Sequence, residues 1–210
     1  MTGPLVVCDL GDVLVRTAPG AQYAALAELT GVLPHRWAAA ADATGLTDAL
    51  ERGQIGFPDF AQELCQRAGA TVAVPLEEIR EAFCRVVAGL DQVMTAAVVP
   101  LAAQGRLLLA SNTSEPHWHR IRQLLADTQV TAPACLSYEV GHCKPDDAFF
   151  QALAAMDERV STEAVFLDNR GEHVAAARRH GLIARLHHDS QASAAWLTAL
   201  AHPGAEPLGS

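Results

Sequence analysis

The sequence predicts an α/β protein in which helices cover both faces of a parallel sheet and a helical insert interrupts the chain. Short apolar runs alternate with helix-like segments after residue 91, the pattern of a parallel sheet. An isolated apolar run, Leu5–Asp9, precedes a long stretch in which Ala, Leu, Glu and Arg recur at helical spacing. With 210 residues and 50% hydrophobic content, the chain is long enough for one core domain with a substantial insert.

The first predicted element is a buried strand, Leu5–Asp9, which is rich in valine and followed by Gly11. Residues 17–91 are predicted to form an all-helical insert of roughly four helices, separated by glycines and prolines. We therefore divide the chain into a core of residues 1–16 and 92–210 and an insert of residues 17–91. The clearest helical stretches of the insert are Ala21–Leu29, Phe57–Ala68 and Leu76–Leu90.

The remaining elements alternate between helix and strand. A proline suits the first turn of a helix, so Pro145 is expected to open one. The tail from Pro203 is expected to be loose. The predicted order is helix Val93–Gln104, strand Arg106–Ser111, helix Pro116–Leu125, strand Ala134–Ser137, helix Pro145–Met156, strand Ala164–Asp168, helix Glu172–His180, strand Leu182–Leu186 and helix Gln191–Ala201.

Polar residues close three of the predicted strands: Asp9, Ser111 and Asp168. The carboxyl ends of parallel strands meet at one edge of a sheet, where open α/β proteins bind ligands. Lys144, one of very few lysines, follows in Gly141–Pro145. Each residue alone has a simpler interpretation: a turn at Asp9, a helix cap at Ser111, a solvated lysine, and a turn at Asp168. Together they favour a site for an anionic group.

Four motifs in this order resemble those of the haloacid dehalogenase (HAD)-like hydrolase superfamily. They are Val6–Leu14, Leu109–Asn112, Lys144-Pro145, and Phe166–Asn169 followed by His173. The match spans most of the chain, and the insert resembles the C1-type cap of that family. The Asp-Leu-Gly-x-Val form of the first motif is most similar to the branch that includes small sugar-phosphate phosphatases. The resemblance implies a HAD-like Rossmannoid parallel sheet with an inserted cap.

The resemblance also implies catalytic roles. Asp9 would attack the phosphorus of a small phosphorylated metabolite and form an aspartyl-phosphate, which splits hydrolysis into two steps. Lys144 would pair with Asp9 and the phosphate. Ser111 and the backbone N–H of Asn112 would donate hydrogen bonds to the transferring oxygens. These residues are the predicted catalytic and phosphate-binding groups.

The implied cofactor is Mg²⁺, which screens the attacking anion from the anionic substrate. Its predicted ligands are Asp9, the backbone carbonyl of Gly11, and Asp168 or Asn169, directly or through water. Two positions depart from the family pattern. Gly11 stands where an acid usually protonates the leaving group. The neighbouring Asp12 is expected to cap or orient the loop rather than to take the place of the missing acid. Asn169 stands where a second Asp is usual.

His173 stands where the family usually has Asn. These departures keep two alternatives open. One is a metal-independent 2-haloacid dehalogenase-like hydrolase, in which Asp attacks carbon and neither the second acid nor Mg²⁺ is needed. The other is a non-catalytic binding or regulatory protein of the same fold. Substrate choice is expected to lie in the cap, with Arg16, Trp37, Glu51 and Arg52 as candidate contacts.

Bulk properties exclude some classes of partner. The net charge of -9 argues against a nucleic-acid footprint, which needs a basic face. No run of about 18 apolar residues predicts a membrane span, and the N-terminus does not resemble a secretory signal. Five scattered cysteines indicate reduced thiols and a cytoplasmic protein. The nine histidines lack metal-ligand spacing and are expected at the surface or satisfied in the core. Oligomeric state is not predicted.

Overall fold

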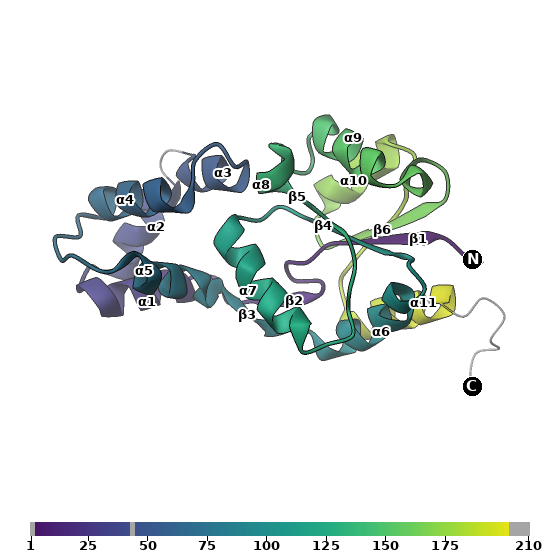
Figure 1. The fold of residues 1–210 in the computed structure, drawn as a ribbon, viewed down its shortest axis with the longest axis horizontal. Helices are drawn as coiled ribbons and strands as arrows, with labels where there is room; N and C mark the ends of the chain where they lie inside the picture. Colours follow the sequence, from purple (N-terminus) through teal and green to yellow (C-terminus); the bar gives the residue numbers. More distant parts are fainter. Residues whose placement is uncertain (1–2, 43–44, 202–210) are drawn as a thin grey trace.

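The computed structural model describes residues 3–42 and 45–201, and its centre is a five-stranded parallel sheet (Figure 1). The strand order is β5-β4-β1-β6-β7. This order places the first strand of the chain in the middle of the sheet, between the two strands that carry the other strand-end motifs. The strands are β1 (Leu5–Cys8), β4 (Leu107–Ser111), β5 (Ala134–Leu136), β6 (Ala164–Asp168) and β7 (Ile183–Leu186).

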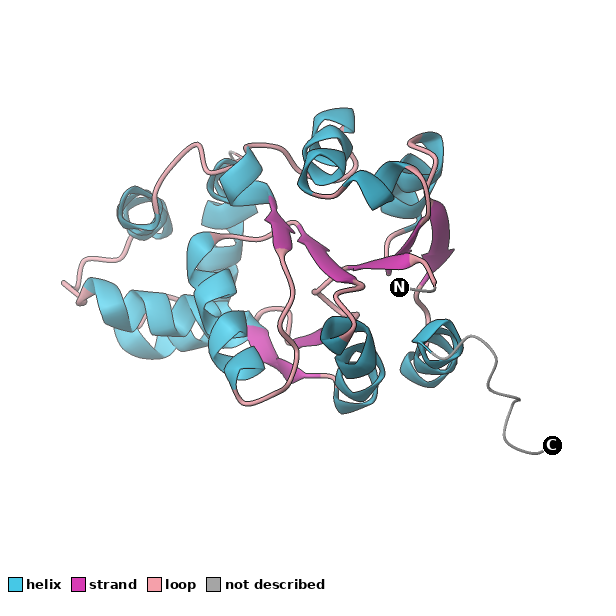
Figure 2. Cartoon of the chain, turned by 45° about the vertical axis from the view of Figure 1, so that its right-hand side comes forward, coloured by secondary structure: helices cyan, strands magenta, loops and turns pink. Residues whose placement is uncertain are grey.

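Helices cover both faces of this sheet, as predicted (Figures 1 and 2). Alternate residues of β1 point to opposite faces, so Leu5 and Val7 pack in one hydrophobic cluster while Val6 and Cys8 pack in the other. A strand buried on both faces needs the continuous apolar run that the sequence has here. One face carries α9 (Asp147–Met156) and α10 (Gly171–Arg179), and the other carries α6 (Gln92–Ala103), α7 (Glu115–Ala126) and α11 (Ser190–Ala201).

The insert extends to one side of the sheet and has its own core (Figure 1). Its buried cluster includes Trp37, Phe60 and Phe83, and the three rings belong to three different helices. Burial of apolar side chains against each other stabilises these short helices, which would be marginal alone. The helices are α1 (Ala21–Thr30), α2 (Pro34–Asp42), α3 (Leu46–Glu51), α4 (Phe57–Ala68) and α5 (Leu76–Phe83).

The insert is not all-helical, which corrects the prediction. The predicted helix Leu76–Leu90 ends at Phe83, continues as a 3-10 turn, η1 (Cys84–Val86), and becomes a strand, β3 (Val87–Leu90). β3 pairs antiparallel with β2 (Val15–Thr17), a strand that the sequence analysis missed. Strands of three and four residues are too short to show a period of two. Among the described residues of the insert, five α-helices form where roughly four were expected.

The stretch between β5 and α9 also differs from the prediction. Ser137 begins a short helix, α8 (Ser137–Val140), instead of ending a strand. Pro145 lies before α9 rather than in its first turn, because Asp146 adopts an extended conformation at the helix N-cap. A further 3-10 turn, η2 (Glu158–Ser161), precedes β6. The tail predicted from Pro203 lies outside the described residues. No helix among the described residues is long and apolar enough to cross a bilayer.

Candidate active site

Lys144 lies between two carboxylates at the carboxyl edge of the sheet. Its Nζ donates to Asp9 Oδ1 at 2.8 Å and to Asp168 Oδ2 at 2.7 Å. A third hydrogen bond runs from Nζ to the Ala110 carbonyl at 2.8 Å. All three acceptors belong to residues within one position of the ends of β1, β4 and β6, so the parallel sheet brings these motifs together. Lys144 is also the sole lysine of the sequence.

Burial sets the electrostatics of this trio. The Lys144 side chain is 1% exposed, and those of Asp9 and Asp168 are 8% and 0% exposed. Burial raises the pKa of Asp9, against the nearby Lys144 charge, which lowers it. Burial also acts to raise the pKa of Asp168, but hydrogen bonds from His173 and Lys144 outweigh it and lower that pKa. Burial lowers the pKa of Lys144 less than the two carboxylates raise it, so the ammonium stays charged.

The loop that carries Lys144 is held by Asn112. The Asn112 Nδ2 donates to the Lys144 carbonyl at 2.8 Å, and Asn112 Oδ1 accepts from the Lys144 N–H at 2.7 Å. The next residue is held as well, because the Thr113 N–H donates to Ser137 Oγ at 2.9 Å, and Ser137 Oγ donates to the Thr113 carbonyl at 3.0 Å. The Asn112 side chain therefore positions Lys144, a role distinct from the backbone contact expected of this residue.

Ser111 ends β4 next to the trio and is buried. Its Oγ donates to the Asn112 carbonyl at 3.3 Å, which is long for a hydroxyl hydrogen bond. A donor held this loosely can turn to a stronger acceptor, such as an anionic oxygen. Ser111 thus lies where the sequence analysis expects it, at the sheet edge that carries Asp9 and Lys144.

Asp168 accepts hydrogen bonds on both oxygens. Oδ1 accepts from the Arg170 N–H at 2.8 Å, and His173 Nδ1 lies 3.0 Å from both Oδ1 and Oδ2. The His173 ring is buried, and its Nε2 has no hydrogen-bond partner among the described residues. The expectation for the histidines is therefore wrong for His173, which is neither at the surface nor fully satisfied.

The loop after β1 contains Gly11 and Asp12. Asp12 Oδ1 accepts from the Thr17 N–H at 3.0 Å and from Thr17 Oγ1 at 2.7 Å, and Asp12 has a positive φ of 54°. Short acidic side chains tolerate this conformation when they bond locally. The prediction that Asp12 orients the loop is confirmed. Gly11 itself leaves open space, since a Cβ added there would meet no heavy atom within 4 Å outside its chain neighbours.

The donor atoms near Asp9 fit a small hard cation. Among the described residues no side chain donates to Asp9 Oδ2, and the Gly11 carbonyl and the Asn169 side chain accept no hydrogen bond there. Carboxylate, carbonyl and amide oxygens are the ligands that Mg²⁺ prefers. Two of these three oxygens are neutral, and Asp168 already binds Lys144 and His173. Across the described residues, no three side chains of His, Cys, Asp or Glu gather as a metal cluster.

The candidate substrate contacts of the insert separate in the structure. Trp37 is fully buried in the core of the insert, so it cannot contact a substrate there. Arg16 is exposed on β2, with its guanidinium near Gly89. Glu51 and Arg52 lie at the end of α3, where the insert touches the core: Arg52 Nη1 donates to Asp146 Oδ2 at 2.6 Å. Only Glu51 and Arg52 of the four candidates are thereby placed beside a motif loop.

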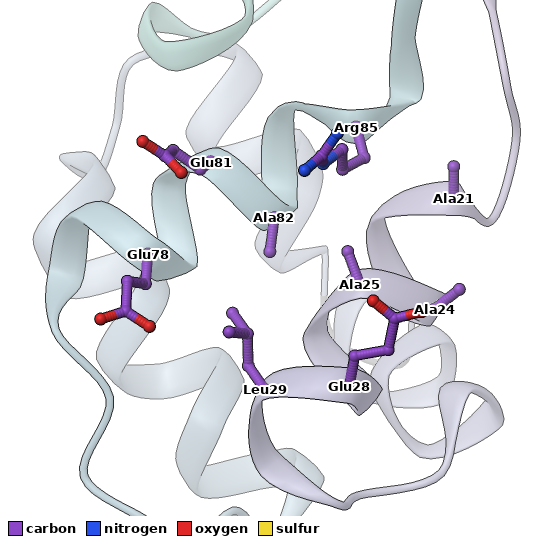
Figure 3. Close-up of a pocket in the computed structure, with 9 residues that line it drawn as sticks. All are labelled: Ala21, Ala24, Ala25, Glu28, Leu29, Glu78, Glu81, Ala82 and Arg85. Carbon is purple, nitrogen blue, oxygen red and sulfur yellow. The ribbon is translucent and has the colours of Figure 1, made fainter.

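A separate pocket of about 430 Å³ lies within the insert, between α1 and α5 (Figure 3). Alanines form its walls, and Glu28, Glu78, Glu81 and Arg85 surround them. None of the predicted site residues lines it. This pocket is therefore distinct from the polar site at the sheet edge.

Three contributions to the site are not apparent from the sequence. The side chain of Asn112, the hydroxyl of Ser137 and the ring of His173 all hold other site residues in place. Asn112 and His173 belong to the second and fourth motifs, so the sequence singles out their positions. It does not show which residues they bind. Ser137 gives no signal, because its contact with Thr113 depends on how β4 and β5 pair.

The chain is similar to several known proteins in sequence or in fold. No family model matches the chain. A sesquiterpene phosphatase of Aspergillus oryzae is 26% identical over 139 residues, which span 65% of this chain and 69% of that protein. Among solved structures, a HAD family enzyme of Bacteroides thetaiotaomicron superposes with a TM-score of 0.77 at 18% identity, covering 89% of this chain and 94% of that one.

The same Bacteroides enzyme has also been solved in complex with magnesium and inorganic phosphate, with a TM-score of 0.74 to this chain. A predicted HAD-like family hydrolase of Porphyromonas gingivalis gives a TM-score of 0.71 at 22% identity, over 89% of this chain and 91% of that one. These likenesses extend across the sheet and the insert alike. These likenesses show that the chain has the fold of HAD family enzymes.

Proposed function

We propose that this protein is a Mg²⁺-dependent phosphatase that hydrolyses a small phosphorylated metabolite through an aspartyl-phosphate. The observation that carries the proposal is the Lys144 ammonium, buried between Asp9 and Asp168 at 2.8 and 2.7 Å. One oxygen of Asp9 is paired with this ammonium, and no described side chain pairs with the other. A fixed carboxylate with one unpaired oxygen is suited to attack an electrophile.

The proposed reaction has two steps on Asp9. Its unpaired oxygen bonds to phosphorus as the ester P–O bond breaks, and water then cleaves the aspartyl-phosphate to regenerate the carboxylate. Lys144 holds Asp9 in position and offers positive charge to the transferring group. Ser111 Oγ and the Asn112 N–H donate to the equatorial oxygens. The Asn112 side chain keeps Lys144 at the distance that this arrangement needs.

The site has one net negative charge, from two carboxylates and one ammonium, while a phosphomonoester adds more. When bound, Mg²⁺ would neutralise the phosphoryl oxygens beside Asp9. Asp9, the Gly11 carbonyl and Asn169 would hold it, with Asp168 as a direct or water-mediated ligand. We expect modest Mg²⁺ affinity, because Asn169 brings an oxygen without charge.

The insert, residues 17–91, is proposed to act as the cap that selects the substrate, and a cytoplasmic location remains the expectation from the cysteines. The relative from Aspergillus oryzae is named a sesquiterpene phosphatase, so isoprenoid phosphates belong among the candidates. Sugar phosphates with an anomeric leaving group are the other class, since they depend least on a general acid.

The test is phosphate release with and without Mg²⁺ from sugar phosphates, isoprenoid phosphates and p-nitrophenyl phosphate. We expect Mg²⁺-dependent turnover that Asp9→Asn abolishes. Turnover that is unchanged in Asp9→Asn would exclude Asp9 as the nucleophile. An absence of turnover on the whole panel, together with no Mg²⁺ binding, would favour a non-catalytic protein of this fold.

A second candidate is a metal-independent dehalogenase-like hydrolase. It is favoured by Asp168, whose two oxygens are already occupied by Lys144, His173 and the Arg170 N–H. In this reaction Asp9 would attack the carbon that carries a halide. Chloride release from 2-chloropropionate in EDTA would support this candidate, and phosphate release that stops in EDTA would exclude it.

A further inference from the structure

The proposed phosphatase has no leaving-group acid on its first motif, because Gly11 occupies that position. The structure leaves the space beside Gly11 open, since an added Cβ would meet no heavy atom within 4 Å beyond its chain neighbours. An alkoxide leaving group departs slowly unless it receives a proton, and a positioned acid contributes about 10²–10⁴-fold. Another part of the chain is therefore a candidate to supply the proton.

The insert touches the core beside the catalytic lysine. A Cβ at Gly53 would lie 2.1 Å from the backbone oxygen of Tyr138 in α8, so the two backbones meet there without room for a side chain. One residue earlier, Arg52 Nη1 donates to Asp146 Oδ2 at 2.6 Å. Asp146 is two residues beyond Lys144. The end of α3 is thus fixed against the loop that carries Lys144 (Figure 1).

Glu51 is the residue immediately before this contact, and it is partly buried. Two charged groups of its own helix end, Asp48 and Arg52, act on its carboxyl, and Arg170 acts on it from the core. Arg170 follows Asp168 and Asn169 directly. Burial raises the pKa of the Cys143 thiol, next to Lys144, while Arg52 lowers it and Glu51 raises it. Glu51 is thus the last residue of the helix that Arg52 and Gly53 fix against the core, and its carboxyl is within electrostatic range of Arg170.

The protonation of Glu51 is suited to this position. Burial raises its pKa, Asp48 raises it further, and Arg170 and Arg52 lower it. A raised pKa keeps a larger fraction of the carboxyl protonated near neutral pH, as a general acid requires. Arg52 and Gly53 supply the independent geometric reason, since they hold the end of α3 against the core.

We propose that Glu51 of the insert is the general acid that protonates the leaving group, in place of the acid missing at Gly11. This inference rests on the proposed phosphatase function. In the first step the Asp9 oxygen bonds to phosphorus, the P–O ester bond breaks, and the Glu51 carboxyl gives its proton to the departing oxygen. In the second step water cleaves the aspartyl-phosphate to regenerate the Asp9 carboxylate and dihydrogen phosphate, which returns one proton to Glu51, so both residues regain their initial state.

The first test compares leaving groups. Glu51→Gln removes the proton and keeps the shape, so turnover of an alkyl phosphate should fall about 10²-fold or more. Turnover of p-nitrophenyl phosphate should stay within about threefold, because p-nitrophenolate leaves without a proton. Glu28→Gln, the same change at an exposed site of the insert, should leave both rates unchanged.

The second test displaces Glu51 without altering it. Gly53→Ala places a methyl group against the Tyr138 backbone oxygen. Gly31→Ala is the control, because it imposes a similar backbone strain at a position where an added Cβ has no heavy atom within 4 Å beyond its chain neighbours. Their φ values are 63° and 73°, so the strain is matched. Gly53→Ala should reproduce the leaving-group dependence of Glu51→Gln, and Gly31→Ala should not.

The third test restores a general acid at position 11, on the loop after β1. Gly11→Asp introduces a carboxyl into the open space, so the double variant Gly11→Asp/Glu51→Gln should recover alkyl phosphate turnover at least tenfold over Glu51→Gln. Equal losses on both substrates in Glu51→Gln, or no loss on either, would overturn the inference while leaving the phosphatase intact. No phosphate release by the unaltered protein from any substrate would instead overturn the proposed function and this inference with it.

Discussion

Replacing Lys144 by methionine is the substitution that most directly tests the buried charge trio. Methionine has a similar length and no charge, so the change leaves Asp9 and Asp168 facing each other with side chains 8% and 0% exposed. It also removes the donor to the Ala110 carbonyl. Breaking a buried ion pair by removing one partner costs about 3–5 kcal/mol. A domain is stable by only about 5–15 kcal/mol, so this loss is large.

A second substitution tests whether the stranded charge causes this loss. Asp168→Asn in the Lys144→Met background removes one of the two stranded charges, and the asparagine oxygen can still accept from the Arg170 N–H. We expect the double variant to be more stable than Lys144→Met by about 1–3 kcal/mol, because one unpaired buried charge is gone.

The assay is urea unfolding at pH 7, followed by circular dichroism, with the slope of the transition checked for each variant. Control variants at an exposed site, such as Glu28→Gln, should unfold at the same urea concentration as the unaltered protein. A loss below about 1 kcal/mol in Lys144→Met, or a double variant no more stable than the single one, would refute the view of Lys144 as a compensating buried charge.

Three further predictions concern other contacts. Asn112→Ala removes both hydrogen bonds to the Lys144 backbone and should lower kcat about tenfold or more with Asp9 intact, as steady-state kinetics would show. Burial lowers the pKa of His117 to about 4. The unfolded chain therefore binds more protons than the folded one between pH 6.5 and 4, and stability should fall by about 2–3 kcal/mol as the pH drops through that range. His117→Phe, which keeps the stacking on Phe83, should flatten this part of the profile in urea titrations. Arg106→Met should destabilise by about 2–4 kcal/mol, because the part-buried carbonyls of Pro4 and Leu200 lose their donor. Thermal unfolding measures this loss, and a loss near zero would contradict the prediction.

The sheet was predictable because its strands are short continuous apolar runs buried on both faces. The runs at β1, β4 and β6 each end in a polar residue, and parallel pairing alone brings those ends to one edge. The β2–β3 pair was not predictable. Val15–Thr17 and Val87–Leu90 are too short to show a period, and they form a sheet only because the chain returns to the same place after the insert.

The site was predictable in its charged groups and not in their supports. Asp9, Lys144 and Asp168 stand in motifs, whereas the fixation of Lys144 by Asn112 depends on two backbone atoms 32 positions away. The contact between His173 and Asp168 was not predictable for a similar reason. The geometry of α10 turns the His173 ring back to Asp168, and the sequence does not show this. Local sequence carries no record of such long-range hydrogen bonds.

The scarcity of lysine has a practical consequence. Lys144 is the chain's only lysine, and its side chain is 1% exposed. Reagents that acylate amines can thus reach the folded protein only at the chain terminus, unless the insert and the 141–146 loop separate from the core. The rate at which Lys144 becomes acylated would then report how often that separation happens. Mass spectrometry of the peptide that contains Lys144 would measure this acylation rate, and hence the rate at which the site opens, without any introduced label.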